Sequence, residues 1–331
     1  MIVIHERGGI FMSRIQNLSQ EIIDGRRLNR NDDLSNFIET PLEEFSESAF
    51  EIQKHFCGNH IDLCTIINGK SGNCSEDCKY CAQSSKHKTQ IDSHKFLPLD
   101  QIFKAARDNQ IAGANRFSIV TSGRALSDKD LELAIESYKF MRKNLSIDLC
   151  ASHGILNRDQ LQKLFDAGVK SYHHNLETSR RFFPEICSTH TFDDRIATIK
   201  AAQSVGLDVC SGGIIGMVET WQDRIDLALE LSELGIQSIP INILMPIRGT
   251  KLESQKILEP ADVFRTIAIF RFINPTANIR LAAGRRVLPQ NGLTAFKAGA
   301  SASITGNMLT IGGTTIKGDI YSLERMGFSN R

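Results

Sequence analysis

The amino-acid sequence predicts an α/β protein built as a (β/α)8 TIM-type barrel with an N-terminal helical extension. Two observations favour this fold class: eight short β-rich runs recur along the chain, and amphipathic helical stretches separate most of them. A chain of 331 residues with 41% hydrophobic residues is long enough for one large barrel. A doubly wound open sheet has the same alternation of strands and helices, so spacing alone leaves that arrangement open.

The expected elements begin with residues 1–56, an N-terminal extension that is polar and partly helical. Met12 offers an alternative start, so residues 1–11 are interpreted as a leader segment or an over-extended start. The barrel is expected to occupy residues 57–331. Its predicted strands are Ile61–Ile67, Arg116–Thr121, Ser146–Ala151, Ser171–Leu176, Asp208–Ile215, Ser238–Leu244, Asn278–Ala283 and Ala300–Thr305. Its predicted helices include Asp130–Lys143, Arg158–Ala167, Phe192–Val205 and Trp221–Leu234.

The composition narrows the class of protein. The formal net charge is only +1, so we expect no nucleic-acid partner and no membrane partner, and a small neutral or singly charged substrate. No apolar stretch reaches the length of a membrane span, and the N-terminus lacks the apolar segment of a secretory signal. The eight cysteines are therefore expected to be reduced thiols and metal ligands in a cytoplasmic protein.

Three cysteines share one short loop. Cys74, Cys78 and Cys81 have C-x3-C-x2-C spacing, and the first predicted strand leads directly into them, which predicts a place at the C-terminal rim of the barrel. A zinc site needs four ligands, and only His87 offers a weak fourth. A ferredoxin-like carrier needs a fourth cysteine nearby, and three inert thiols fit this polar loop poorly. The spacing favours a [4Fe–4S] cluster that keeps one iron free of protein ligands.

The cysteine loop, with the aromatic Tyr80 before Cys81, resembles the signature of radical S-adenosylmethionine (SAM) enzymes. The extended run Cys-Ser-Glu-Asp-Cys-Lys-Tyr-Cys-Ala-Gln resembles the biotin synthase family, and that resemblance covers nearly the whole chain. It implies that SAM chelates the open iron and that an electron from the cluster cleaves SAM to a 5′-deoxyadenosyl radical. It also implies that Tyr80 lies against the adenine; ordinary loop packing is the alternative role.

Further motifs extend the resemblance to the binding of SAM and substrate. The run from Ser171 to Thr178 is similar to the family's YNHNL[DE]T strand, in which His173, Asn175 and Glu177 would point into the barrel. The resemblance implies that Asn175 and Glu177 bind SAM, and that His173 and Asn175 face the substrate. The glycine-rich run after Cys210 is similar to a G-x-I-x-G-x-x-E strand, which implies an adenine contact for Ile214. Asn242, in a VPIN-like strand, would bind the ureido ring of the substrate, and a turn-forming Asn is the alternative.

An auxiliary iron–sulfur cluster is also implied by the resemblance. Cys150, Cys210 and Arg280 match three of the family's four ligands, whereas the fourth position is Ser118, a poorer iron ligand than a thiolate. We hypothesise that Cys64, together with Cys57, replaces the missing thiolate; the usual cluster is [2Fe–2S], and the substitution leaves its nuclearity open. Cys187 is interpreted instead as a small buried hydrophobe.

The resemblance implies sulfur insertion into dethiobiotin to form biotin, with a flavodoxin- or ferredoxin-type electron donor and a homodimeric assembly. It also implies that residues 57–331 form a radical SAM barrel whose C-terminal part is typical of this family. No protein acid or base is expected. The alternatives are a related radical SAM enzyme, such as a hydrogenase maturase or a pyrrolysine-pathway mutase, and a non-catalytic iron–sulfur electron-transfer protein.

Overall fold

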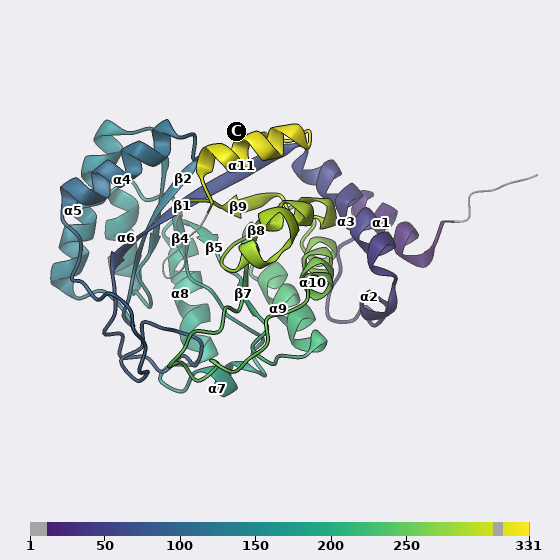
Figure 1. Ribbon diagram of the computed structural model, residues 1–331, viewed down its shortest axis with the longest axis horizontal. Coiled ribbons are helices and arrows are strands. Elements are labelled where there is room, and N and C mark those ends of the chain that lie inside the picture. The colour runs from purple at the N-terminus through teal and green to yellow at the C-terminus, as the bar shows by residue number, and fades with distance from the viewer. Residues whose placement is uncertain (1–11, 307–313, 331) are drawn as a thin grey trace, which may run out of the picture.

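The computed structural model describes residues 12–306 and 314–330, and in these a closed barrel of parallel strands forms the centre of the molecule (Figure 1). The strands are β1 (His60–Lys70), β2 (Arg116–Thr121), β3 (Asp148–Ser152), β4 (Ser171–His173), β5 (Asp208–Cys210), β6 (Gly213–Ile215), β7 (Ser238–Ile243), β8 (Asn278–Leu281), β9 (Ala302–Ile304) and β10 (Ser329–Asn330). Strand β9 pairs back onto β1, which closes the barrel, and β10 adds to the start of β1.

The predicted fold class is confirmed, and the open sheet is excluded by the β9–β1 pairing. Each of the eight predicted strands coincides with part of the barrel wall, and the run Asp208–Ile215 is divided into β5 and β6. This division arises because β6 pairs with β7 while β5 pairs mainly with β4. The prediction that residues 1–11 are a leader segment or an over-extended start concerns residues that lie outside the described ones.

Helices connect successive strands and cover the outside of the barrel (Figure 1). They are α4 (Leu99–Ile111), α5 (Asp128–Asn144), α6 (Arg158–Asp166), α7 (Phe183–Ile186), α8 (Phe192–Ser204), α9 (Trp221–Glu233), α10 (Pro260–Ile273) and α11 (Ile316–Arg325), with the 3-10 segments Arg285–Val287 and Pro289–Ala298 before β9. Side chains cap several N-termini: Thr220 accepts a bond from the backbone of Asp223, and Thr191 one from Asp194. The four predicted helices are all present within a few residues.

The predicted N-terminal extension is helical in part. It forms α1 (Arg14–Ile23), α2 (Asn36–Glu39) and α3 (Leu42–Cys57), which lie together at the end of the molecule beside α10 (Figure 1). An aromatic cluster of Phe37, Phe45 and Phe272 joins α2, α3 and α10, with ring centroids 5.0–5.4 Å apart. Within the described ranges, no helix combines the length and apolar character that a membrane crossing requires.

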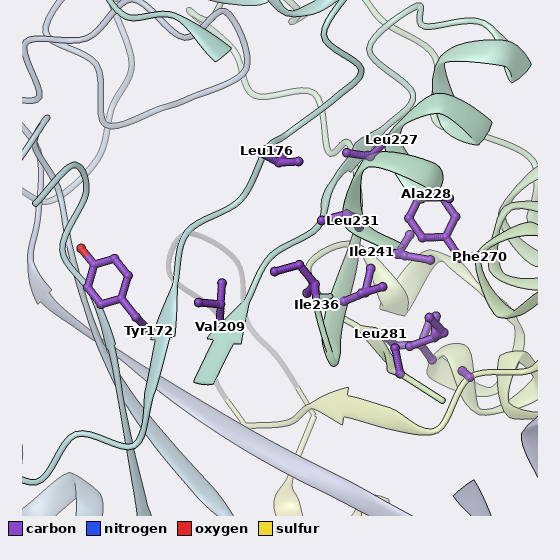
Figure 2. Close-up of a cluster of buried hydrophobic side chains, with 14 of the residues drawn as sticks. Tyr172, Leu176, Val209, Leu227, Ala228, Leu231, Ile236, Ile241, Phe270 and Leu281 are labelled. Carbon is purple, nitrogen blue, oxygen red and sulfur yellow. The ribbon is translucent and has the colours of Figure 1, made fainter. Parts of the chain in front are cut away.

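Successive residues of each barrel strand face opposite sides of the wall, with apolar side chains mostly outside and polar ones mostly inside. Outward-facing residues such as Tyr172, Val209 and Ile241 belong to the same buried hydrophobic core as Leu227 of α9 and Phe270 of α10, part of which Figure 2 shows. Because successive strand residues face opposite sides, the intervening residues point into the barrel, and these are largely polar or sulfur-containing. The apolar layer outside the wall thus stabilises a barrel whose interior is free for chemistry.

Candidate active site

A single cavity of about 730 Å³ lies inside the barrel. It brings together residues from the cysteine loop and from most of the strands. Of the predicted site residues, those that line it are Cys64, Tyr80, Cys81, Ser118, Cys150, His173, Asn175, Glu177, Cys210, Ile214, Asn242 and Arg280. Cys74 and Cys78 do not line the cavity, but they belong to the same loop as Cys81. Residues spread over more than 200 positions therefore share one chamber.

The cysteine loop follows the C-terminal end of β1, as the sequence predicts. Backbone hydrogen bonds curl it into a compact turn: Cys81 N–H donates to the carbonyl of Cys78 at 3.0 Å, and Cys74 N–H donates to the carbonyl of Gln83 at 3.0 Å. Cys74 and Cys78 are buried, while Cys81 is partly exposed toward the cavity. The loop therefore turns one of its three thiols toward the interior.

Two acidic residues tie the cysteine loop to the segment between α7 and α8. The carboxylate of Asp77 accepts a bond from Ser188 N–H at 2.9 Å, and Lys79 N–H donates to the carbonyl of Ile186 at 2.9 Å. Burial raises the pKa of Asp77, but the hydrogen bonds from Ser188 and its neighbours outweigh it, so the pKa lies well below its usual range. Because this carboxylate stays ionised, it fixes the loop over the normal pH range.

Glu76, the other acidic residue, begins a buried chain of polar side chains that reaches the segment carrying Glu177, just after β4. The Nε–H of Arg195 donates to Nε2 of His190 at 3.1 Å, so His190 carries its ring proton on Nδ1 and donates it to Glu76 at 2.5 Å. Arg195 also donates to the carbonyl of Asn175 at 2.7 Å and lies 3.6 Å from the carboxylate of Glu177. Sequence reasoning missed Arg195 and His190, because nothing in their spacing connects them to either motif.

Cys187 is a buried core residue, as expected, and it also contacts the cysteine loop. Its Sγ lies 3.7 Å from Sγ of Cys78 and 3.3 Å from Nδ1 of His190. The bond with Cys78, and then those with His190 and Thr189, lower the pKa of Cys187 to about 4 despite burial. Cys78, Cys187 and His190 meet the geometry of a metal-binding group, although the lone pair and the proton of His190 are already engaged. Cys187 is therefore a fourth thiol beside the cysteine loop.

Asn175 and Glu177 lie just after β4, at the edge of the cavity. The side chain of Asn175 donates to Glu177 at 3.2 Å and accepts from the backbone of Gly212 at 3.0 Å. Glu177 has a left-handed backbone, with φ of 71°, and its N–H and carbonyl bond to Gly212 and Ile214. A side chain at Gly213 would meet the Glu177 carbonyl at 2.4 Å, so glycine is required for this close approach.

Three further predicted contacts surround the same end of the cavity: Tyr80, Ile214 and Asn242. The amide of Asn242 donates to the Gly213 carbonyl at 3.1 Å and accepts from Ala283 N–H at 3.1 Å, so it also joins β6 and β7 to the end of β8. Burial raises the pKa of Tyr80 well above its usual range, which keeps the phenol neutral.

Deeper in the barrel lie three thiols on three strands. The thiols of Cys64 on β1 and Cys150 on β3 interact with each other, and this raises the pKa of Cys64 and lowers that of Cys150. Burial raises the pKa of Cys210, but a bond from His173 and the charges of His173 and Arg280 outweigh it, so its pKa falls to about 7. Ser118 Oγ is buried at the cavity and makes no hydrogen bond with the described residues. An orphaned polar atom beside three thiols fits a site that holds a bound group.

Arg280 shares this depth with an acidic residue that the sequence interpretation overlooked. Its guanidinium donates to the carbonyls of Asp62 and Ser303 at 3.1 and 3.2 Å, and lies 3.3 Å from the carboxylate of Asp62. Asp62 also accepts from Arg116 at 2.7 Å. Burial raises the pKa of Asp62, but Arg280 and Arg116 hold it below its usual range. The sequence could have identified Asp62 as a residue of this site, because residues two apart on a strand, such as Asp62 and Cys64 on β1, point to the same face.

Cys57 is not part of this group. It ends α3, accepts a bond from Arg271 at 3.4 Å and does not line the cavity. The suggestion that it joins Cys64 at the auxiliary site therefore lacks support from its position.

A parallel barrel whose first strand leads into a three-cysteine loop defines a radical SAM enzyme, and residues 70–231 match the Radical SAM superfamily. Residues 240–329 match the Biotin and Thiamin Synthesis associated domain. The chain is 53% identical over 315 residues to a biotin synthase of Clostridium beijerinckii, covering 95% of this chain and all of the relative. It is 53% identical over 314 residues to a biotin synthase of Alkaliphilus metalliredigens, covering 95% and 99%. The chain belongs to the biotin synthase family.

Solved structures share the fold at much lower identity. Methylornithine synthase aligns with a TM-score of 0.82 at 19% identity, covering 95% of this chain and 97% of that one. A maturase of the [FeFe]-hydrogenase aligns with a TM-score of 0.79 at 16% identity, covering 96% and 75%. At these identities the likeness shows a shared fold alone. The family match therefore decides for a biotin synthase, and the non-catalytic alternative is wrong.

Proposed function

We propose that the chain inserts sulfur into dethiobiotin to form biotin, with SAM and two iron–sulfur clusters. One observation carries this proposal: a single cavity joins the end that bears the cysteine loop to the deeper thiols of Cys64, Cys150 and Cys210. A site that makes a carbon radical and a site that delivers sulfur need such a shared chamber. We also propose residues 57–331 as the catalytic unit and residues 1–56 as its extension.

Cys74, Cys78 and Cys81 are proposed to hold the [4Fe–4S] cluster with its fourth iron open to SAM. The donor set fits, because the loop offers three thiols and keeps its carboxylates occupied elsewhere. When bound, this cluster supplies the electron that cleaves SAM, and the auxiliary cluster supplies sulfur. The structural anchors through Asp77 and Glu76 would hold the loop rigid during the reaction.

Tyr80, Asn175, Glu177 and Ile214 are proposed to bind SAM. The carboxylate of Glu177 suits the ribose hydroxyls, and the apolar side chain of Ile214 suits the adenine face. His173, Asn175 and Asn242 are proposed to face dethiobiotin. Asn242 retains one amide proton beyond its bond to Gly213, which suits hydrogen bonding to a ureido ring.

For the auxiliary cluster we propose Cys150, Cys210 and Arg280 together with Cys64 in place of Ser118. Thiolates are much better iron ligands than a serine hydroxyl, and Cys64 lines the same cavity as Cys150, Cys210 and Arg280. The hydroxyl of Ser118 would then turn to the bound group as a hydrogen-bond donor. This donor set leaves the nuclearity of the cluster open.

The reductant is proposed to be an acidic flavodoxin- or ferredoxin-type protein that docks beside the cysteine loop. Two surface loops meet there: Lys251 N–H bonds to the carbonyl of Lys79, and Lys88 N–H to that of Gly249. They carry five exposed cations, Lys79, Lys86, Lys88, Arg248 and Lys251, none of which pairs with a carboxylate within the described residues. Unpaired charge of one sign attracts a partner of the other sign.

A homodimer is proposed as well. Large apolar side chains are exposed on the neighbouring helices α5 and α6, at Leu133, Phe140 and Phe165. Exposed apolar area of this kind is typical of an interface between subunits. Light scattering after size-exclusion chromatography would give the mass, and a monomer at micromolar concentration would contradict the assembly.

The deciding experiment measures products of the anaerobically reconstituted protein. With dithionite, SAM and dethiobiotin, we expect 5′-deoxyadenosine and biotin to form together. Omission of dethiobiotin should suppress 5′-deoxyadenosine strongly. Formation of 5′-deoxyadenosine without biotin would contradict sulfur insertion but keep the radical SAM chemistry.

A further inference from the structure

The barrel wall is incomplete at the N-terminal ends of β5 and β7. Strand β5 pairs with β4 along its whole length, from Asp208 to Cys210. It pairs with β7 at one position alone in the described register, Cys210 with Ser238. Pairing on that side continues only higher up, where Gly213 of β6 meets Ile241. Below Cys210, therefore, no described ladder bond joins the two strands.

The central cavity extends into this gap. Five residues around the gap are exposed to solvent and also line the cavity that contains Cys150, Cys210 and Arg280. They are Gln203, Gly206, Asp208, Gly235 and Gln237, and they define the lower opening. Two of the five are glycines, and a Cβ atom at Gly235 would meet no atom within 4 Å. The cavity that holds the deep thiols is therefore bordered by solvent-exposed residues at this lower end.

A single side chain crosses the outer edge of the lower opening. The amide of Gln203 donates to the carbonyl of Leu234 at 2.8 Å, which joins the last turn of α8 to the end of α9, before β7. On either flank, Val209 and Ile236 pack into the apolar cluster of Figure 2. The flanks are thus fixed by buried apolar contacts, and the crossing side chain of Gln203 is the movable part.

The charge around the inner end of the lower opening favours an anion. The guanidinium groups of Arg116 and Arg280 both line the cavity there, and they share the single carboxylate of Asp62. At this inner end the two guanidinium groups therefore exceed the carboxylate of Asp62 by one positive charge, while the carboxylate of Asp208 lies at the outer, solvent-exposed edge of the opening. A small anion would meet both a favourable field and hydrogen-bond donors at this depth.

We propose that the lower opening admits a small sulfur anion, hydrosulfide, to the auxiliary site. The proposal rests on the proposed function, in which each biotin formed removes one sulfur atom from that site. SAM and dethiobiotin would fill the other end of the cavity, around Tyr80, Glu177 and Asn242. A separate opening beside Cys210 lets sulfur return without displacing either of them.

The test labels Cys210 in metal-free protein, without SAM or dethiobiotin. Methyl methanethiosulfonate converts a cysteine thiolate to its methyl mixed disulfide and releases methanesulfinate. Peptide mass spectrometry then gives the rate at Cys210, with Cys81 at the opposite end as internal reference. We expect Gln237→Trp to slow Cys210 several-fold and Gln203→Ala to accelerate it, both with Cys81 unchanged. The matched control Gln222→Trp, at an exposed position of α9, should change neither rate.

The proposal would be overturned if the ratio of the Cys210 labelling rate to the Cys81 labelling rate were the same in all variants. It would also be overturned if only Asn242→Trp, at the opposite end of the cavity, slowed the labelling of Cys210. If Gln237→Trp does not fold, Gln203→Ala still decides the question by its acceleration. A sulfonatoethyl methanethiosulfonate should also label Cys210 faster than its trimethylammonioethyl analogue, each normalised to free cysteine. The reverse order would overturn the assignment of an anion. Because no cluster is present, failure here leaves biotin formation untouched, and failure of biotin formation leaves these rates untouched.

Discussion

Asp62 and Arg280 lie against each other inside the barrel, with the carboxylate 3.3 Å from the guanidinium. Both side chains are 3% exposed, so neither charge has water as an alternative partner. Arg116 binds the other oxygen of the same carboxylate at 2.7 Å. The arginine that the family resemblance gives to the auxiliary cluster is therefore held by a neighbour from β1, two residues before Cys64.

Asp62→Asn should destabilise the metal-free protein strongly. Removal of one partner leaves buried cations without a counter-charge, and this costs about 3–5 kcal/mol in comparable buried pairs. Urea unfolding measures the change in the free energy of unfolding. The control Asp108→Asn breaks the exposed Lys104–Asp108 pair on α4 and should have little effect. Equal stability of the two variants would contradict the role of Asp62.

Cys64→Ala should change the auxiliary cluster and leave the [4Fe–4S] loop intact. We expect lower iron and sulfide content after anaerobic reconstitution, together with an altered auxiliary absorption spectrum. The control is Cys57→Ser, because Cys57 lies outside the cavity at the end of α3. An unchanged auxiliary spectrum in Cys64→Ala would rule out Cys64 as a ligand.

Gly213→Ala should weaken SAM binding. The new Cβ would lie 2.4 Å from the carbonyl oxygen of Glu177, so the strained backbone of that residue must shift. We expect the dissociation constant of SAM to rise about tenfold, which corresponds to about 1.4 kcal/mol. Equilibrium dialysis with the reconstituted protein measures it. Gly235→Ala introduces backbone strain at a φ of 67°, away from Glu177, and its Cβ meets no atom within 4 Å. As a control for strain, it should keep the affinity of the unmodified protein.

Charge reversal near the cysteine loop should slow electron delivery by a protein donor. The variant combines Lys79→Glu, Lys88→Glu and Lys251→Glu, so that this surface repels an acidic donor. Reduction by flavodoxin hydroquinone should become slower, and its rate should no longer decrease as the salt concentration is raised. The small reductant dithionite should reduce both proteins alike. A control with the same charge change is Lys129→Glu, Lys139→Glu and Lys143→Glu on α5, all exposed. Equal slowing in the control would mean that total charge, and not this surface, decides.

His153 should make the stability of the protein depend on pH. Burial lowers the pKa of His153 from 6.5 to about 3, and its ring bonds to Thr121 and Tyr138 at 3.0 Å. Below pH 6.5 the His153 ring takes up a proton in the unfolded chain but stays neutral in the folded protein. The free energy of unfolding therefore decreases as the pH is lowered from 6.5 to about 3. At pH 5 this loss is about 2 kcal/mol.

His153→Gln should therefore reduce the difference between the unfolding free energies at pH 7 and pH 5 by that amount. The exposed His55 provides the control, and His55→Gln should leave the difference unchanged. If both variants behave alike, the pH dependence has another origin.

The eight strands and their order could be predicted because local alternation of apolar and polar residues is written in each strand. The cysteine loop was equally accessible, since all three thiols lie within eight consecutive residues. Strand alternation also predicted that His173, Asn175 and Glu177 share a face, and all three line the cavity. The contact between Cys187 and Cys78 could not be predicted, because the two residues are 109 positions apart in the chain.

The sequence by itself determined the barrel, the loop for the first cluster and the inward faces of the strands. These follow from local periodicity and from short motifs. Only the tertiary structure decided which inward side chains meet, because the stagger of a closed barrel sets the level of each residue on its strand. That stagger brings Asp62 to Arg280 across 218 positions, and it ends the β5–β7 ladder at Cys210, which leaves the lower opening.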